Sequence, residues 1–367
     1  MVALKWSGQA TARVLVLALA SSATAWTVGA ASAGAPGPAT SLPVKGTLTG
    51  VSATSASNAW AVGDTNVTGG TKPVILHWNG HSWKEQVSPG AGGQSVLSAV
   101  TAISARDAWA VGTGSNFSKG FVLHWNGRSW QRVAVPSPGV GSQLNGVVAT
   151  SAHSVWAVGL ESPTNSTLQP LILHWNGSVW RRFTGVPGAD GAILSGVAAR
   201  SASDVWAVGL SSAIKTLILH WNGSSWKRLA SPSPTFGGGG ASLTGVAAPS
   251  ARLAFAVGMA GSEAAPLGVL LQWNGVKWTR VSQPNLTDDS LAAVAATSVR
   301  NAWAVGSAVS NALILRWNGV SWKKVTGAGP SDAFLNAVAA TSARNAWAVG
   351  GENGKLLIVH WNGSHWT

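Results

Sequence analysis

The sequence predicts an all-β fold, a seven-bladed β-propeller of four-stranded antiparallel blades. The first observation is a Trp-Ala-Val-Gly run, or a close variant of it, that recurs at intervals of 44 to 50 residues. The second is that each copy contains four short runs rich in β-branched and aromatic residues. Repeats of this length with several strand-like runs are typical of radial β architectures. The copies are anchored at Trp60, Trp109, Trp156, Trp206, Phe255, Trp303 and Trp347.

The four runs follow in the same order in each copy. In the first copy they span residues 48–54, 59–63, 74–78 and 82–87. An Asn-Gly pair separates the third run from the fourth and predicts a tight hairpin, because both residues tolerate the positive φ of a type I′ turn. The innermost run has Gly or Ala at its third position, as at Gly50 and Ala99, which suits the crowded axis of a propeller.

Three segments are expected along the chain: a signal peptide over 1–33, a flexible lead-in over 34–47 and the propeller over 48–367. Lys5 and Arg13 precede an apolar run and a small-residue cleavage site at 31–33, which favours a cleaved signal peptide over a retained membrane anchor. We therefore expect a secreted, extracellular protein, free or held at the cell wall. The chain contains no cysteine, hence no disulfide and no thiol for a lipid. The blades are expected near 48–90, 97–138, 144–187, 194–235, 243–285, 291–328 and 335–367.

The repeat resembles a known family. A glycine ends the second run, an aromatic residue ends the third, and a tryptophan lies in the fourth, as in Gly63, Trp78 and Trp83. This order resembles the kelch repeat, and more closely the secreted WAVG, HWNG and W repeat proteins of high-GC Gram-positive bacteria, over about residues 48 to 367. Kelch units usually carry Gly-Gly after the second strand, which only Gly350-Gly351 does here, and a tyrosine where this chain has tryptophan. The resemblance implies a propeller, most often with a binding or scaffolding role, and carries over no active-site residue.

The composition excludes two kinds of catalytic chemistry. The chain has neither tyrosine nor cysteine, so it can form neither a copper-radical site of the galactose-oxidase type nor the tyrosine nucleophile of sialidases. A histidine recurs at one position of the third strand in five of the seven copies, and residues at this position in separate blades lie too far apart to share a metal ion. We therefore expect a structural role for it, no metal site and no cofactor. The histidines are His77, His124, His174, His220 and His360, with Gln272 and Arg316 in the other two copies.

The carboxylates and tryptophans leave alternatives open. Asp107 and Asp204 occupy a turn position where Asx side chains cap turns. An acid/base pair from different blades would make the protein a glycosidase or lyase, for which Asp64, Glu161, Glu263 and Glu352 are the candidates, although nothing in the sequence brings them together. The three tryptophans per copy are expected to pack between blades rather than to stack on sugars. Trp83 and its equivalents, nearer the rim, are the expected exceptions.

The charge is strongly basic, with 24 Lys and Arg against 11 Asp and Glu. Without Lys5 and Arg13 of the signal segment the balance is 22 − 11 = +11. Many cations lie on the fourth strand, where they either protect an exposed sheet edge or hold the protein near anionic wall polymers. No nucleic-acid reader motif accompanies them, so no specific nucleic-acid partner is expected. These residues are Lys84, Arg132, Arg181, Arg182, Lys227, Arg228, Arg280, Lys323 and Lys324.

The loop between the second and third strands varies most between copies. From the second-strand glycine to the third-strand tryptophan the offset ranges from 11 to 16 residues, whereas the other turns barely change. These loops and the connections between copies lie on one face of a propeller, and binding residues tend to lie on such loops. The alternative is that they are unconstrained solvent loops. The candidate binding-face residues are Asp64, Asn66, Lys72, Asn116, Lys119, Glu161, Asn165, Lys215, Glu263, Glu352 and Lys355.

A ring of small polar residues is expected at the channel mouth on the same face, with solvation of channel water as its role. It consists of Thr49, Ser98, Asn145, Ser195, Thr244 and Asn336. Together these features predict a secreted, non-catalytic binding or scaffold module, probing cell-surface polysaccharide or protein with its variable loops, and monomeric. The last copy stops at Thr367 with only a stub of a fourth strand, so residues 42–45 are a candidate to pair there and close the ring; the alternative is closure by blade packing alone.

Overall fold

The computed structural model describes residues 40–367, except 69, 91–92, 117, 137–138, 165–166, 188–190, 263–264, 283, 310 and 326–329. The expected signal peptide at 1–33 lies outside the described residues. The part of the chain that is described is built from strands, and within it no helix is long and apolar enough to cross a membrane.

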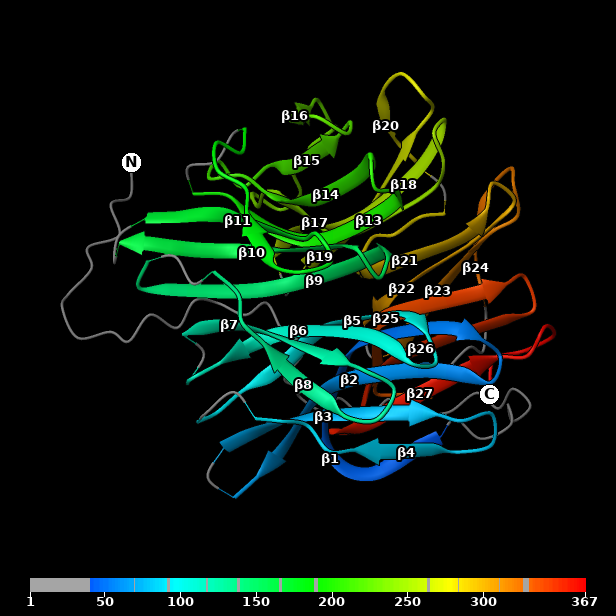
Figure 1. Ribbon diagram of the computed structural model, residues 1–367. Coiled ribbons are helices and arrows are strands. Elements are labelled where there is room, and N and C mark those ends of the chain that lie inside the picture. The colour runs from blue at the N-terminus through cyan, green and yellow to red at the C-terminus, as the bar shows by residue number, and fades with distance from the viewer. Residues whose placement is uncertain are drawn as a thin grey trace. The chain divides into compact units, whose positions relative to one another are not determined.

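The strands follow one another in seven repeats, labelled in chain order in Figure 1. The first repeat holds β1 (Thr40–Ser55), β2 (Asn58–Val67), β3 (Gly70–Trp78) and β4 (Trp83–Gln86). The second holds β5 (Val96–Ser104), β6 (Asp107–Gly114), β7 (Lys119–Trp125) and β8 (Trp130–Val133). The third holds β9 (Gly141–Ser151), β10 (Ser154–Thr164), β11 (Thr167–Trp175) and β12 (Trp180–Arg182).

The remaining repeats have the same plan. The fourth holds β13 (Ile193–Ser201), β14 (Asp204–Leu210), β15 (Thr216–Trp221) and β16 (Trp226–Leu229). The fifth holds β17 (Ala241–Ser250), β18 (Leu253–Ser262), β19 (Ala265–Trp273) and β20 (Trp278–Arg280). The sixth holds β21 (Asp289–Ser298), β22 (Asn301–Ala308), β23 (Asn311–Trp317) and β24 (Trp322–Lys324). The seventh holds β25 (Ala333–Ser342), β26 (Asn345–Glu352) and β27 (Lys355–Trp361).

The prediction of seven four-stranded blades is wrong. The described strands form six sheets: five of four strands, and one of seven in the order β25-β26-β27-β1-β2-β3-β4. Counted by its sheets, the propeller therefore has six blades, and the largest contains strands of both the first and the last repeat. The physical reason lies in β1, which is long enough to belong to both repeats.

The two ends of the propeller meet along β1. Its first residues pair with β27, where Leu42 lies opposite Leu356 and Lys45 opposite Lys355, and its residues from Gly46 onward pair with β2. β27 has this edge free because the chain after it contributes only a bridge between Trp361 and Trp366. The hypothesis that the segment around 42–45 closes the ring is thus confirmed, and eight residues of the expected lead-in, 40–47, belong to a paired strand.

The second-strand glycine is required by a close approach within each sheet. A Cβ at Gly63 would collide with the backbone carbonyl of Thr47 on β1, and a Cβ at Gly112 would meet the carbonyl of Val96 in the same way. Each innermost strand has a register irregularity at this point, such as that between Leu48 and Gly50. The Gly that ends the Trp-Ala-Val-Gly run is therefore set by the packing of strands one and two.

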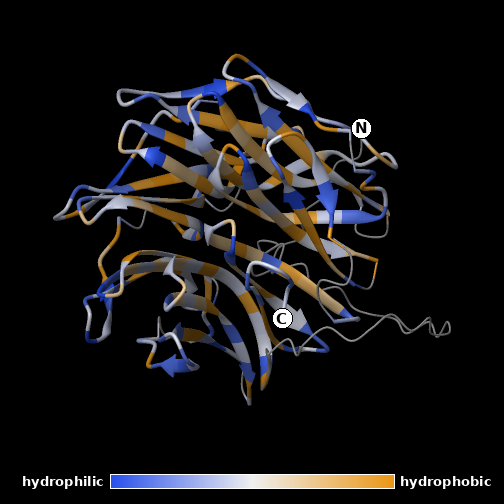
Figure 2. Ribbon diagram, turned by 90° about the vertical axis from the view of Figure 1, so that its right-hand side faces the viewer, coloured by the Kyte–Doolittle hydropathy of each residue, from blue (hydrophilic) through white to orange (hydrophobic). Residues whose placement is uncertain are grey.

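The core lies between successive repeats and is built around tryptophan triads. The second-strand ring of one repeat contacts the third- and fourth-strand rings of the next: Trp60 lies 5.1 Å from both Trp125 and Trp130. The last triad joins Trp347 to Trp78 and Trp83 of the first repeat, at 5.1 and 5.2 Å. Figure 2 shows hydrophobic colouring along the strands and hydrophilic colouring at many turns.

The expectation that the tryptophans are core residues is confirmed for the second and fourth strands, but the expected rim exceptions are wrong. The half-buried rings lie mainly on the third strand, at Trp78, Trp175, Trp221 and Trp273. Trp206 is 4% exposed, and the fourth-strand residues Trp130 and Trp180 are also 4% exposed. Of the fourth-strand tryptophans, only Trp83 is half-buried. The reason is that the fourth-strand ring turns edge-on into the neighbouring repeat, as in the 90° angle between Trp60 and Trp130, instead of facing solvent.

Candidate functional site

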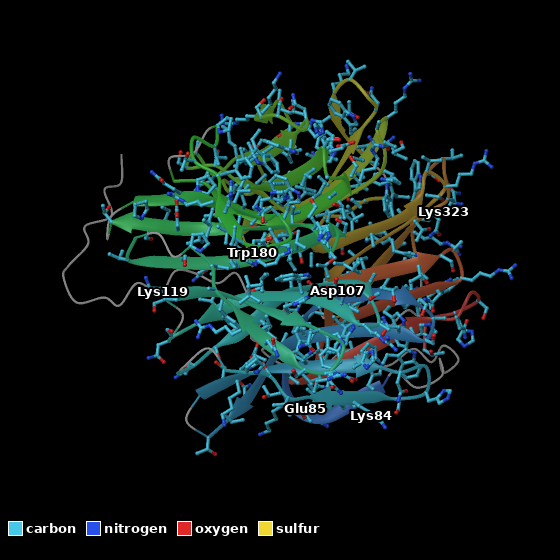
Figure 3. The ribbon with its side chains drawn as sticks, in the orientation of Figure 1. Lys84, Glu85, Asp107, Lys119, Trp180 and Lys323 are labelled. Atoms are coloured by element: carbon cyan, nitrogen blue, oxygen red, sulfur yellow. The ribbon has the colours of Figure 1, made fainter. Side chains whose placement is uncertain are left out.

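The propeller has two end faces with different loops. The variable-loop face consists of the connections between second and third strands and between successive repeats, such as 115–118 and 134–140. The constant-turn face consists of the turns between first and second strands and between third and fourth strands, such as 105–106 and 126–129. In Figure 3, Lys119 of the variable-loop face lies at the left of the view, and Lys323, just past a constant turn, lies at the right.

Backbone strain is confined to the variable-loop face. Every described non-glycine residue with positive φ lies there: Ser115, Asn116, Ile214, Asp288, Val309, Asp332 and Asn353. Asn and Asp tolerate this conformation, but for a β-branched residue it is an outlier. Ile214 has φ 52° and is 59% exposed, and Val309 has φ 50° and is 84% exposed. Strained residues of this kind cluster at ligand-binding and switch regions.

Hydrogen bonds between loops hold the strained positions. The backbone NH of Asn116 donates to the carbonyl of Gln94 at 3.1 Å, and its side-chain Oδ1 accepts from the NH of Gln94 at 3.1 Å. The NH of Val309 donates to the carbonyl of Asp288, and the carbonyl of Ile214 accepts from the NH of Ala241 at 3.0 Å. At these three positions a strained residue is therefore hydrogen-bonded to a neighbouring loop.

The candidate binding-face residues fall into three groups. Asn66, Lys72, Lys215 and Lys355 are exposed, while Asp64 and Glu352 are half-buried. Asn116 and Lys119 tie loops together, since the Lys119 ammonium donates to the carbonyl of Gly139 at 3.2 Å. Glu161 is buried and forms an ion pair with Arg182 of the same repeat. Asn165 and Glu263 lie outside the described residues.

Two of the described carboxylates of this face are held by cations. Arg182 holds Glu161, and Lys324 holds the buried Asp289 at 2.6 Å. Burial raises the pKa of the Asp64 carboxyl to about 6, yet no ion pair joins it to another described side chain. Within the described residues, no group of three or more His, Asp or Glu side chains could hold a metal ion.

The polar residues of the expected channel mouth connect neighbouring repeats. Thr49 Oγ1 donates to the carbonyl of Leu97 in the next repeat at 2.7 Å, and Asn145 Nδ2 donates to that of Leu194 at 2.8 Å. Thr244 Oγ1 donates to Leu291 at 3.0 Å in the same way, and Asn336 Nδ2 reaches Leu48 at 2.9 Å, joining the last repeat to the first. Ser98 and Ser195 make no such bond within the described part of the chain. The sequence predicted that these side chains solvate channel water. It did not predict that four of them donate to carbonyl groups of the neighbouring repeat.

The repeated histidine has the structural role predicted for it. His77 stacks on Trp60 of its own repeat at 4.1 Å, and its Nε2 lies 2.8 Å from Asn58 Oδ1. Burial lowers the pKa of the His77 imidazole. In the sixth repeat the guanidinium of Arg316 replaces the imidazole, 4.9 Å from the ring centroid of Trp303.

Asp107 and Asp204 do more than form turns. Asp107 Oδ1 lies 2.9 Å from Nε2 of His124, and Asp204 Oδ1 lies 2.9 Å from Nε2 of His220. Burial raises the pKa of the Asp204 carboxyl, but the hydrogen bonds from His220 and Arg200 outweigh it, so the pKa is lowered overall. The sequence contained a partial signal for this contact, because in four of the seven repeats Asn or Asp at this position occurs together with His on the third strand.

The cations of the fourth strand divide into two sets. Arg182 and Lys324 neutralise the buried carboxylates of Glu161 and Asp289. The other seven, from Lys84 to Lys323, are exposed and form no ion pair with a described carboxylate. Arg182 and Lys324 therefore pair with buried carboxylates, a role that differs from the two expected from the sequence, edge protection and wall binding.

Comparisons with known proteins give the fold. No family model matches the chain, and no curated protein matches it. Among solved structures, YCF48 bound to D1 peptide aligns with a TM-score of 0.60 at 14% identity, covering 88% of this chain and 95% of that one. The WD40 repeats of RRP9 align with a TM-score of 0.58 at 12% identity, covering 86% and 94%. The GH74 xyloglucanase from Xanthomonas campestris aligns with a TM-score of 0.59 at 16% identity, covering 90% and 54%.

At these identities the likeness shows a β-propeller and nothing finer. The kelch-like resemblance is thus confirmed as far as the fold class, without assignment to a family.

Proposed function

We propose that the protein is an exported, non-catalytic binding module whose variable-loop face recognises a protein segment at the cell surface. The observation that carries this proposal is the confinement of positive-φ non-glycine residues to that face. Strain of about 1 to 3 kcal/mol per residue persists only where the surrounding structure imposes it, and it is typical of ligand-binding surfaces. Export rests on the sequence pattern of residues 1–33.

A protein segment suits the exposed side chains of this face better than a polysaccharide does. Ile214 and Val309 present aliphatic surface at the loop tips. A sugar-binding surface would offer aromatic faces, and no Trp or Phe side chain of the described residues is exposed. The YCF48 propeller, which has the same fold, was solved with a bound D1 peptide. Exposed aliphatic residues alone do not decide the matter, since Val276 and Val320 are exposed on the constant-turn face with relaxed backbones.

The absence of catalysis is proposed from the state of the carboxylates. A glycosidase needs two carboxyl groups about 5 to 10 Å apart with their oxygens free to act. Of the candidates on this face, Glu161 is buried against Arg182. Glu352 lies opposite Lys355 in the β-ladder. Asp64 lies on β2 of the same seven-stranded sheet, three strands from Glu352 on β26, or about 14 Å at about 4.8 Å per strand.

The test is a selection of displayed peptides and a glycan array, both on the mature protein. Peptides enriched on the wild type should bind the double variant Ile214→Gly, Val309→Gly at least tenfold more weakly, because each buried aliphatic side chain contributes about 1.5 to 3 kcal/mol. The melting temperature should stay level or rise, since glycine adopts positive φ without strain.

The matched control is Val276→Gly, Val320→Gly, which removes two exposed valines from the other face. It should leave peptide affinity unchanged. Equal losses in both double variants, or enrichment on the glycan array without any enriched peptide, would contradict the proposal. A secreted chain that begins near Gly34 would support export, and retention of residues 1–33 would oppose it.

A further inference from the structure

The geometry points to a second, independent binding surface on the constant-turn face: an arc of six cations that takes a base-free phosphodiester polymer, such as poly(glycerol phosphate). The arc consists of Arg106, Arg128, Arg252, Lys277, Arg300 and Arg344, all exposed. Figure 2 views the propeller from the side on which these turns lie. The inference does not depend on the variable-loop face.

Four of the six cations occupy one repeated position. Arg106, Arg252, Arg300 and Arg344 each stand between the first and second strands of their repeats. Arg128 and Lys277 stand in the adjoining turns between third and fourth strands. The fifth, sixth and seventh repeats follow one another, and the seventh meets the first through β1, so the arc runs from the fifth repeat round to the second.

These cations have no acidic partner. None of the ion pairs between described residues involves any of the six. The acids on this face are Asp107 and Asp204, and hydrogen bonds to His124 and His220 occupy both. Six of the other described carboxylates, Asp64, Glu161, Asp288, Asp289, Asp332 and Glu352, belong to the opposite end of the blades. Most of the described carboxylates are therefore concentrated at the variable-loop end, and the arc of cations gives the constant-turn face a positive potential.

The fold does not require arginine at the repeated position. In the second repeat the NH of Arg106 donates to Ser104 Oγ at 3.1 Å, and the side-chain stem packs against Gly127 of the Asn-Gly turn. In the first repeat Ser57 makes the same contacts, to Ser55 Oγ at 3.2 Å and to Gly80. Serine thus satisfies the turn, and the guanidinium groups extend beyond it into solvent.

The chemistry of the arc selects its partner. Phosphodiester oxygens suit both the bidentate fork of arginine and the point charge of lysine. Six cations distributed over several repeats suit an extended polymer better than a single small anion. Single-stranded nucleic acids also depend on stacking of bases on exposed aromatic rings. Among the described residues this surface exposes no Trp or Phe side chain, and its exposed rings are the small imidazoles of His81, His153 and His365. A base-free chain is therefore the occupant that fits.

The test measures binding of poly(glycerol phosphate) to the mature protein between 50 and 200 mM salt. With about 0.7 counterions released per contact, six contacts predict a roughly 300-fold loss of affinity over this range. The variant Arg106→Ser, Arg252→Ser, Arg300→Ser, Arg344→Ser keeps about two contacts and should lose only about 7-fold over the same range, from a much weaker starting affinity. Its melting temperature should match the wild type, because Ser57 and Ser203 already occupy this position.

The matched control removes four cations from the fourth strands: Arg132→Ser, Lys227→Ser, Arg228→Ser, Lys323→Ser. It has the same net charge as the test variant and should keep most of the affinity and of the salt dependence. Equal losses in the two variants would assign binding to net charge and overturn the proposal. So would tighter binding of oligo(dT) or of polygalacturonate than of poly(glycerol phosphate). If the fourfold variant does not fold, Arg300→Ser, Arg344→Ser should still lower the salt slope by about 1.4.

Discussion

Replacing Trp206 by alanine tests the inter-repeat core at a single ring. The indole is 4% exposed and lies 4.2 Å from His220, 5.5 Å from Trp273 and 5.4 Å from Trp278, measured between ring centroids. Burial of about 150 to 250 Å² at about 25 cal/mol per Å² gives roughly 4 to 6 kcal/mol, and measured Trp→Ala losses of about 3 to 5 kcal/mol agree with it.

The assay is unfolding followed by far-ultraviolet circular dichroism, in denaturant and on heating. For a folded body of about 330 residues, the unfolding entropy is about 0.7 kcal/mol per kelvin, so the melting temperature should fall by about 4 to 7 °C. Trp206→Phe is the matched control, because Phe255 occupies the same position in the fifth repeat, and it should cost less than about 1.5 kcal/mol. A loss below about 1 kcal/mol for Trp206→Ala would show that the ring is not part of the core.

Three further predictions follow from individual contacts. Deleting residues 34–45 should lower the melting temperature by several degrees, because it removes the strand paired with β27, and an unchanged value would show that the pairing does not close the propeller. Asp64→Asn should raise the free energy of unfolding above about pH 6, and progressively less as the pH falls towards 4. The reason is that a carboxyl whose pKa is raised to about 6 penalises folding once it is ionised. The same gain at every pH in this range would contradict the raised pKa of Asp64. Asp204→Ala should cost about 1.5 to 3 kcal/mol at pH 7, and progressively less as the pH falls below about 3.8 towards the lowered pKa of the folded state. Asp204→Asn should keep a contact with His220 like the one that Asn58 makes with His77, so equal losses in the two variants would refute the charged hydrogen bond.

The sequence was sufficient for the repeat, the strands and the core. The Asn-Gly pairs and the alternation around Trp60 predicted the hairpins, because both signals are local. The predicted type I′ turn is wrong, since φ is positive at Gly80 and its equivalents but not at the Asn before them. The structural histidine could be predicted because its position in the repeat fixed its distance from the axis. The identity of its partner, such as Asn58 for His77, could also have been predicted from the pairing of the two positions across repeats.

The joining of the two ends could be proposed but not established from sequence. Leu42 and Leu356 are over 300 residues apart, and the number of sheets depends on whether β1 continues from one repeat into the other. The ion pair of Glu161 with Arg182 was missed because it depends on which way a fourth-strand side chain turns. Positive φ at Ile214 and Val309 was also missed, since a β-branched residue gives no indication of it in a sequence.

Hydrogen exchange of the propeller with and without a peptide from the display selection tests most directly whether the variable-loop face is the binding surface. If this face binds the peptide, exchange should be slower in the loops that contain Asn116, Ile214 and Val309, and in the connections hydrogen-bonded to them at Gln94, Ala241 and Asp288. The turns at 105–106 and 126–129 should exchange at the same rate in both states. Slower exchange confined to those constant turns, with no change in the variable loops, would contradict the account.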